Sequence, residues 1–295
     1  MSGPMSKFLG EIAVRHPSTR GAVESILRID AEVDGLPTAA FFEPVSLVEV
    51  ADGKRRLLAL SADLLNAWRQ HAAYGARTRL RLMERGIFGE LQAHRVLSAM
   101  ALARAHMEAA AQAAYCEQAL VDAANSGSWD GISETVLRTM LGTSLRIAAK
   151  RDARVDEFIT PPEHLPLEIG ETIKALDRFV AAGQSPGRHS QVMYSFLCEF
   201  AHPTLRSVKT FFDTTDSAGG WTIRYRVGDA GTVIEPEFVM VLETVLENMR
   251  YGYAASELLL RSRIGGVYPD LELIPPSRAD LRYVWSQLLQ RPAEG

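Results

Sequence analysis

The feature that most restricts the fold of this chain is an alanine-rich run, LSAMALARAHMEAAAQAAYCEQALVDAA, at residues 97–124. Val121 is its single β-branched residue, and alanine, leucine, methionine and glutamine lose little conformational freedom in a helix. Few charges occur between residues 96 and 121, so a helix there can be buried on most of its sides. The run therefore predicts a long helix, 87–124, at the centre of the fold.

The predicted fold class is all-α, a helical bundle of about five to seven helices. The predicted helices cover residues 55–85, 87–124, 130–149, 167–182, 186–202, 236–263 and 278–290, with shorter helices at 20–32 and 204–212. Gly86 is expected to separate the first two long helices. Near 221–234 apolar and polar residues alternate, which predicts one small β-hairpin with its turn at VGDAG, 227–231.

The chain is expected to have two parts. Residues 1–45 contain four prolines and are expected to form an N-terminal arm. Residues 46–295 are expected to form the helical bundle domain, with the hairpin as an insertion and a C-terminal helix. The segment SLVEV, 46–50, is typical either of a strand with a turn at ADG or of the lead-in to a helix. The apolar residues of the arm need burial, against their own domain or a neighbour's, so we expect at least a dimer.

The net charge of −4 hides a basic segment. Residues 54–104 carry ten Lys and Arg against three Asp and Glu, a local charge of +7, which leaves −11 for the other residues. Such a segment could bind the phosphate groups of a nucleic acid, so nucleic acid is one candidate partner. The interpretation that we favour is a solvated helix face, or pairing with the acidic remainder of the protein.

Several classes of protein are not expected from the motifs. The start of the chain has no apolar signal-peptide core, and no run approaches 18 apolar residues, so we expect a cytoplasmic protein without a membrane partner. Cys116 and Cys198 lie in apolar helical runs outside any CxxC pattern, and both are expected to be buried free thiols. The sequence has no P-loop, dinucleotide-binding glycine pattern, HExxH or EF-hand loop. We therefore expect no cofactor and no metal site.

Polar residues on the predicted central helix mark a candidate site. Arg104, Glu108 and Gln112 line one side at i, i+4 spacing, and Arg104 and Glu108 are expected to pair. If the pair is buried it would anchor a polar network, because a buried charge needs a partner. His106 points nearly the opposite way and is expected to be exposed or partly exposed. The Arg104 side is expected to face helix 186–202, since both helices are polar only along one line.

The helix 186–202 ends in YSFLCEFAHPTL, which places Glu199 and His202 three residues apart before Pro203. One face is predicted to hold Val192, Met193, Phe196, Leu197 and Phe200, and the other Gln191, Ser195, Cys198, Glu199 and His202.

Two interpretations of this helix end are open. In the first, His202 satisfies the last carbonyls of the helix and Glu199 holds the imidazole. In the second, Glu199 orients His202 as a general acid or base, and Arg104 supplies positive charge for an anionic substrate. The candidate catalytic residues are His202, Glu199, Arg104 and Glu108. Convergence of these residues in an open cleft would favour catalysis, and burial with mutual bonding would favour the structural role.

The segments LARAHMEAAAQAAY (102–115) and YSFLCEFAHPTL (194–205) resemble bacterial all-helical families of unknown function that are loosely related to the HEPN superfamily. The resemblance covers roughly residues 60–265, and Cys198 stands where serine is usual. It implies a helical bundle that tends to dimerise. HEPN ribonucleases resemble one another in an arginine followed closely by a histidine. None of the seven histidines here has an arginine five to seven positions upstream, which argues against that nuclease chemistry.

The favoured functional expectation is a non-catalytic helical interaction module, in a bacterial defence or stress locus. It would act by self-association, as a homodimer or other homo-oligomer, or through a protein partner. The alternative is an atypical HEPN-like nuclease or hydrolase that uses the Arg/Glu/His polar site.

Overall fold

The computed structural model describes most of the helical part of the chain. The described residues are 4–21, 23–24, 27–28, 48–51, 54–57, 62–93, 95–126, 132, 135, 138–139, 167–183, 189–202, 212–225, 236–261, 263–265 and 270–272. The chain forms two compact units, each built from three segments. Unit 1 contains Met1–Gly35, Arg77–Ala110 and Gly187–Tyr253, and unit 2 contains Leu36–Ala76, Ala111–Pro186 and Ala254–Gly295.

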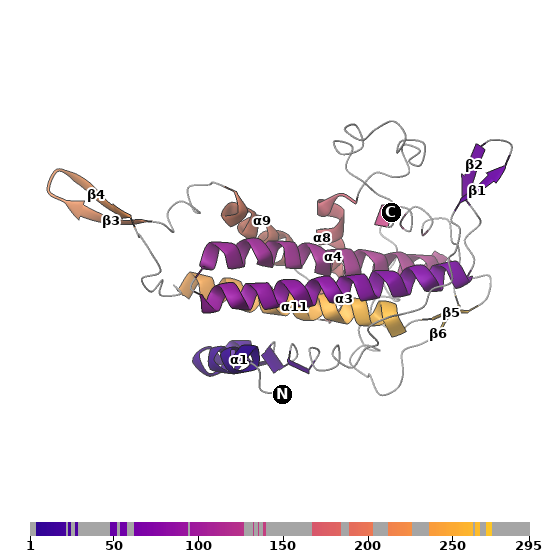
Figure 1. The fold of residues 1–295 in the computed structure, drawn as a ribbon, viewed down its shortest axis with the longest axis horizontal. Helices are drawn as coiled ribbons and strands as arrows, with labels where there is room; N and C mark the ends of the chain where they lie inside the picture. Colours follow the sequence, from indigo (N-terminus) through magenta and orange to yellow (C-terminus); the bar gives the residue numbers. More distant parts are fainter. Residues whose placement is uncertain are drawn as a thin grey trace. The chain divides into compact units, whose positions relative to one another are not determined.

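The predicted all-α class is confirmed. The long helices are α1 (Pro4–Arg15), α3 (Ala62–Gln92), α4 (Val96–Ser126), α8 (Ile169–Gly183), α9 (His189–Ala201) and α11 (Pro236–Arg261), shown in Figure 1. A short 3-10 helix, η1 (Pro17–Thr19), follows α1. The described residues of the predicted helix 130–149 are also helical. The predicted helix 278–290 lies outside the described residues, as does nearly all of 204–212.

The boundary between α3 and α4 lies at residues 93–95, so the prediction that Gly86 separates two helices is wrong. Gly86 lies inside α3, where a Cβ would come within 3.0 Å of the Leu102 Cδ1 atom. The glycine therefore lets the backbone of α3 approach a side chain of α4. This close packing offsets the conformational cost of a glycine inside a helix. The turn is held by Arg95, whose side chain donates to the carboxylate of Glu90 at 2.6 and 2.7 Å.

Within the described residues, three short pairs of antiparallel strands accompany the helices. β1 (Val48–Ala51) pairs with β2 (Lys54–Leu57), so the strand alternative for SLVEV is correct. β3 (Phe212–Ser217) pairs with β4 (Gly220–Tyr225), and β5 (Arg263–Gly265) pairs with β6 (Asp270–Glu272).

A β-hairpin is present in this part of the chain, and β4, which lies almost entirely within the predicted range 221–234, is one of its two strands. β4 coincides with the predicted strand that starts near Trp221, whereas β3 precedes it in the chain. The turn lies at Ala218–Gly219, and Gly219 has a φ of 94°, a conformation that costs glycine nothing. The predicted turn at 227–231 and the returning strand lie outside the described residues.

The first part of the predicted arm packs within unit 1. Leu9 and Ile12 of α1 are buried, and the ring of Phe8 meets the ring of Phe88 on α3 edge-on, with centroids 6.2 Å apart. Ser18, just after α1, donates a hydrogen bond to Glu243 on α11. These apolar groups are thus buried by their own chain, so α1 gives no argument for a dimer.

Unit 1 is held together where α4 crosses α11. A Cβ on Gly252 would come within 2.9 Å of the Ala110 Cα and closer still to the Ala110 Cβ, so the two backbones are almost in contact. Leu80 of α3 packs at the same point, 3.5 Å from that Cβ position. Next to it the buried Tyr253 hydroxyl donates to Glu84 Oε2 at 2.7 Å. Small residues here allow α4 to lie deep in the core, as its alanine content predicted.

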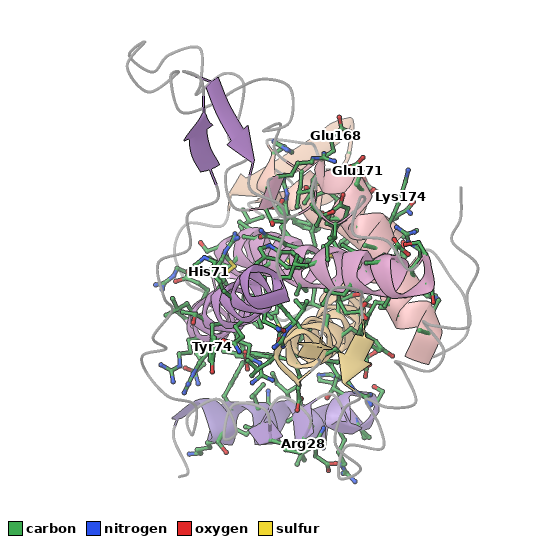
Figure 2. The ribbon with its side chains drawn as sticks, turned by 90° about the vertical axis from the view of Figure 1, so that its right-hand side faces the viewer. Arg28, His71, Tyr74, Glu168, Glu171 and Lys174 are labelled. Carbon is green, nitrogen blue, oxygen red and sulfur yellow. The ribbon has the colours of Figure 1, made fainter. Side chains whose placement is uncertain are left out.

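Unit 2 has polar ties of its own. Trp68 Nε1 donates to Thr139 Oγ1 at 2.9 Å, and the buried Arg69 donates to the Leu259 carbonyl. Arg138 forms an ion pair with Glu171 at 3.0 Å. Figure 2 shows Glu168, Glu171 and Lys174 close together at the start of α8. Glu168 and Lys174 are exposed.

Replacement of Gly252 by alanine tests the α4–α11 contact. The added methyl group has no room against Ala110, so the variant is expected to lose about 1–3 kcal/mol of unfolding free energy, measured by urea denaturation. The matched control is Gly89→Ala, at a helical glycine with nothing within 4 Å of the new Cβ. That change should stabilise by up to about 1 kcal/mol. Equal effects of the two substitutions would contradict the contact.

Candidate functional site

The side chain of Arg104 is the centre of a polar cluster between α4 and α9 in unit 1. Its Nε donates to Glu108 Oε1 at 3.1 Å, and its Nη2 donates to the Tyr194 hydroxyl at 3.1 Å. The Tyr194 hydroxyl in turn donates to Glu108 Oε1 at 2.9 Å. The predicted Arg104–Glu108 pair is therefore confirmed, with both side chains about a quarter to a third exposed, at 26% and 31%. The prediction that this side of α4 faces the helix carrying His202 is also confirmed.

His202 lies immediately after the last residue of α9 and is exposed. Its backbone amide donates to the Cys198 carbonyl at 3.1 Å, so the residue extends the last turn. Its Nε2 atom lies 3.4 Å from Arg104 Nη1. A guanidinium can only donate, so this contact is a hydrogen bond only while Nε2 carries no proton. At 3.4 Å it is longer than a strong N–H···N contact.

The fourth candidate residue, Glu199, lies on α9 one turn before His202 and is half-buried. The structure thus brings Arg104, Glu108 and His202 together, with Glu199 on the helix that supplies the histidine. Cys198 is also half-buried, which corrects the prediction of a fully buried thiol, whereas Cys116 is buried as expected.

The electrostatics of the cluster keep Arg104 charged and Tyr194 neutral. Burial lowers the pKa of Arg104, but its hydrogen bond to the Tyr194 hydroxyl and its interactions with Tyr194, Cys198 and Glu108 outweigh burial, so the pKa is raised. Burial, together with Glu108, raises the pKa of Tyr194 to about 12, against the opposing effect of Arg104. The tyrosine therefore keeps its proton at neutral pH, as its hydrogen bond to Glu108 requires.

Tyr194 was not among the candidate residues, although it supplies two of the three hydrogen bonds of the triangle. The sequence does carry a signal for it. Tyr194, Cys198 and His202 follow one another at i, i+4 and i+8, so they form a stripe along α9 that faces the same way.

The predicted apolar face of α9 needs a correction. Met193, Leu197 and Phe200 are buried, but Val192 is 69% exposed and Phe196 is half-buried. The buried side is centred on a helical stripe that includes Ser190, because the Ser190 hydroxyl is bonded to the Asn248 side chain at 3.0 Å. Val192 lies two residues after Ser190, about 200° around the helix, and therefore points away from the buried side.

His106 is buried, so the prediction of an exposed side chain is wrong. It lies on the side of α4 opposite Arg104. This side faces the core, and alanines line it. Burial lowers the pKa of His106 to about 3, and within the described residues its Nε2 has no hydrogen-bond partner. The ring is therefore neutral at physiological pH.

Two further groups on α4 are buried without a role in the cluster. Burial raises the pKa of Glu117 well above its ordinary value, and the charge of Asp122 adds to the effect. Burial raises the pKa of the Cys116 thiol to about 12, so this cysteine is a poor nucleophile. Neither residue reaches solvent, so neither can act on a soluble substrate.

The basic segment 54–104 is divided between several environments. Arg69 and Arg77 are buried, Arg95 and Arg104 are paired with glutamates, and Arg79 and Arg85 are exposed on α3. Part of the local positive charge is therefore used inside the protein, and the interpretation of the segment stays a prediction.

Two features are absent from the part of the chain that the structure describes. His, Cys, Asp and Glu side chains do not gather there in a group of three or more that could hold a metal ion. Among those residues, moreover, none of the helices combines the length and apolarity needed to cross a membrane.

Comparison with known proteins gives no relative of this chain. No family model matches it, no curated protein matches it significantly, and no solved structure does so either. The HEPN resemblance remains a prediction from the two short motifs.

Removal of the Tyr194 hydroxyl tests the cluster. Tyr194→Phe should cost about 1–2 kcal/mol of unfolding free energy, because Arg104 and Glu108 each lose a hydrogen bond in a half-buried setting. In a double-mutant cycle with Arg104→Gln the two changes should couple by about 1 kcal/mol. The control is Ser195→Ala, at the exposed neighbour whose hydroxyl bonds only its own helix, through the Gln191 carbonyl. Additive effects in the cycle would contradict the triangle.

His106 gives a pH prediction. The unfolded chain binds a proton near the ordinary pKa of 6.5, whereas the buried ring does so only near 3. Stability is therefore complete above pH 6.5 and is lost as pH falls toward 3, by on the order of 3 kcal/mol between pH 7 and pH 4.

The matched variant for this prediction is His106→Leu, which has similar volume and cannot take up a proton. Urea unfolding at the two pH values should give a smaller loss for the variant than for the wild type. An identical loss in the two proteins would show that the acid sensitivity comes from another group.

Proposed function

We propose that this protein is a non-catalytic helical interaction module that acts by self-association. The observation that supports the non-catalytic part of the proposal is the internal bonding of the Arg104 cluster, and self-association is the expectation from the sequence. The groups that a catalytic site would offer to a substrate are occupied by each other: Arg104 by Glu108 and Tyr194, and the Nε2 atom of His202 by Arg104.

The arrangement of His202 supports this role over catalysis. A general base needs a lone pair that can reach a substrate proton. The Nε2 atom of His202 lies 3.4 Å from the Arg104 guanidinium, so a lone pair on that nitrogen would be directed at a donor and not at a substrate. The guanidinium is held on its other sides by Glu108 and Tyr194. The cluster therefore ties α9 to α4, and His202 closes it at the end of the helix. The expected setting, from the resemblance, is a bacterial defence or stress locus.

Self-association is tested by light scattering of the purified full chain over a range of concentrations. The expected result is a molar mass of at least two chains, with dissociation on dilution. A single-chain mass at every concentration, including high concentration, would count against the proposal.

The catalytic alternative is tested with His202→Gln and a single-stranded RNA substrate. The variant keeps a hydrogen-bonding side chain beside Arg104, so it should lose about 1 kcal/mol of stability or less. RNA should remain intact with either protein. Cleavage by the wild type that falls 100-fold or more in a variant with an unchanged melting temperature would establish an enzyme instead.

A further inference from the structure

The hairpin formed by β3 and β4 in unit 1 is a sheet of two strands. Each strand has six residues, and within the described residues neither strand has a second neighbour. A sheet of two strands is only marginally stable in water, whereas three or more strands are more stable. Each edge strand also presents a row of backbone N–H and C=O groups with which a further strand can pair.

The turn determines which backbone groups lie on the outer edge of β4. Ser217 and Gly220 flank the two-residue turn and are paired, and a pair in that position exchanges both of its hydrogen bonds. In β4 the positions bonded to β3 therefore recur at every second residue from Gly220. The residues between them direct their N–H and C=O groups to the outer edge, and they are Trp221, Ile223 and Tyr225.

These positions allow β4 to pair with β4 of a second copy in antiparallel register. Ile223 of one copy then stands opposite Ile223 of the other on a two-fold axis, and Trp221 stands opposite Tyr225 on both sides of it. In this register each outward backbone group at these positions bonds across the join. A shift of one residue would instead place outward groups opposite groups that are bonded to β3. β4 is therefore complementary to itself.

The residue types of β4 suit this pairing. Aromatic and β-branched residues at directly opposite positions stabilise an antiparallel pair, and the register places such residues opposite one another. Segment 220–225 contains no proline, lysine or acidic residue, so β4 lacks the residues that commonly block the edge of a sheet. Its one charged residue, Arg224, stands opposite Asp213 within its own hairpin.

The edge formed by β3 is less suited to self-pairing. β3 contains Asp213 and Asp216, so two adjacent copies of β3 would bring carboxylates together at the join, which is repulsive. Pairing of β3 with β4 of the next copy would leave an open edge at each end and would continue into a chain of copies. Pairing through β4 closes at two copies and leaves the acidic β3 at both edges of the joined sheet.

We propose that β4 is the surface through which this protein self-associates, and that two copies join their β4 strands into one continuous antiparallel sheet. The inference rests on the proposed self-association and names the element that performs it.

A proline on the outer edge tests the pairing, by light scattering and sedimentation of the full chain, with circular dichroism to check the fold. Ile223→Pro removes an outward N–H group and spares the bonds to β3, so the dimer should weaken at least tenfold. The matched control is Thr214→Pro, at the directly opposite residue of β3, whose N–H points to the other edge. Its dimer should be unchanged. Equal weakening by the two prolines would overturn the assignment to β4.

A charge swap tests the register. Because residue 223 meets its own copy, Ile223→Lys and Ile223→Glu should each place like charges opposite one another and weaken the homodimer at least tenfold. An equal mixture of the two variants should form a heterodimer at least tenfold tighter than either homodimer, a rescue that misfolding cannot produce. A mixture that associates no better than the separate variants would overturn the proposed pairing.

The outcomes separate the two proposals. A wild-type dimer that is unchanged by Ile223→Pro overturns the β4 edge and leaves self-association in place. A chain that is monomeric at every concentration overturns both. An assembly that continues to grow beyond two copies as the concentration rises also overturns pairing through β4, because that pairing closes at two.

Discussion

The contact between Ala110 and Gly252 is the constraint on which the rest of unit 1 depends. Two helices whose backbones nearly touch can exclude water along their crossing only if both present small residues there. That approach places one side of α4 in the core, with its alanines and with His106. The opposite side is left to carry Arg104 and Glu108. The division of α4 into a packed side and a polar side therefore follows from how closely α11 approaches it.

The Arg104 cluster provides the hydrogen-bond partners that the polar side of α4 needs. A guanidinium that is only about a quarter exposed needs partners for its donors, and α4 itself supplies one, Glu108. The second partner, Tyr194, comes from α9, and its hydroxyl both accepts from Arg104 and donates to Glu108. Each side chain in the triangle thus bonds to both of the others, which fixes the position of α9 along α4. The same closure leaves little capacity for a substrate, which is why the cluster supports a structural role.

The charges of the basic segment show why a count along the sequence is a weak guide to function. Arg69 and Arg77 lie in the core, and Arg95 holds the turn between α3 and α4 through Glu90. Arg79 and Arg85, by contrast, are exposed on α3. Residues that are adjacent in the sequence thus have different surroundings in the structure.

The sequence by itself determined the helices and the polar line on α4. Helix propensity and i, i+4 spacing are local properties, so the alanine-rich run, the start of α11 at Pro236 and the Arg104–Glu108 pair could all be predicted. Only the tertiary structure decided the burial of His106 and the entry of Tyr194 into the cluster. The first depends on the closeness of α11 to α4, and the second on Arg104 opposite Tyr194. The β3–β4 pairing was missed although its turn at Gly219 is local. A helical wheel drawn from the sequence gives the direction of a side chain. Whether that side chain is buried or exposed depends on the neighbouring helices, which the wheel does not include.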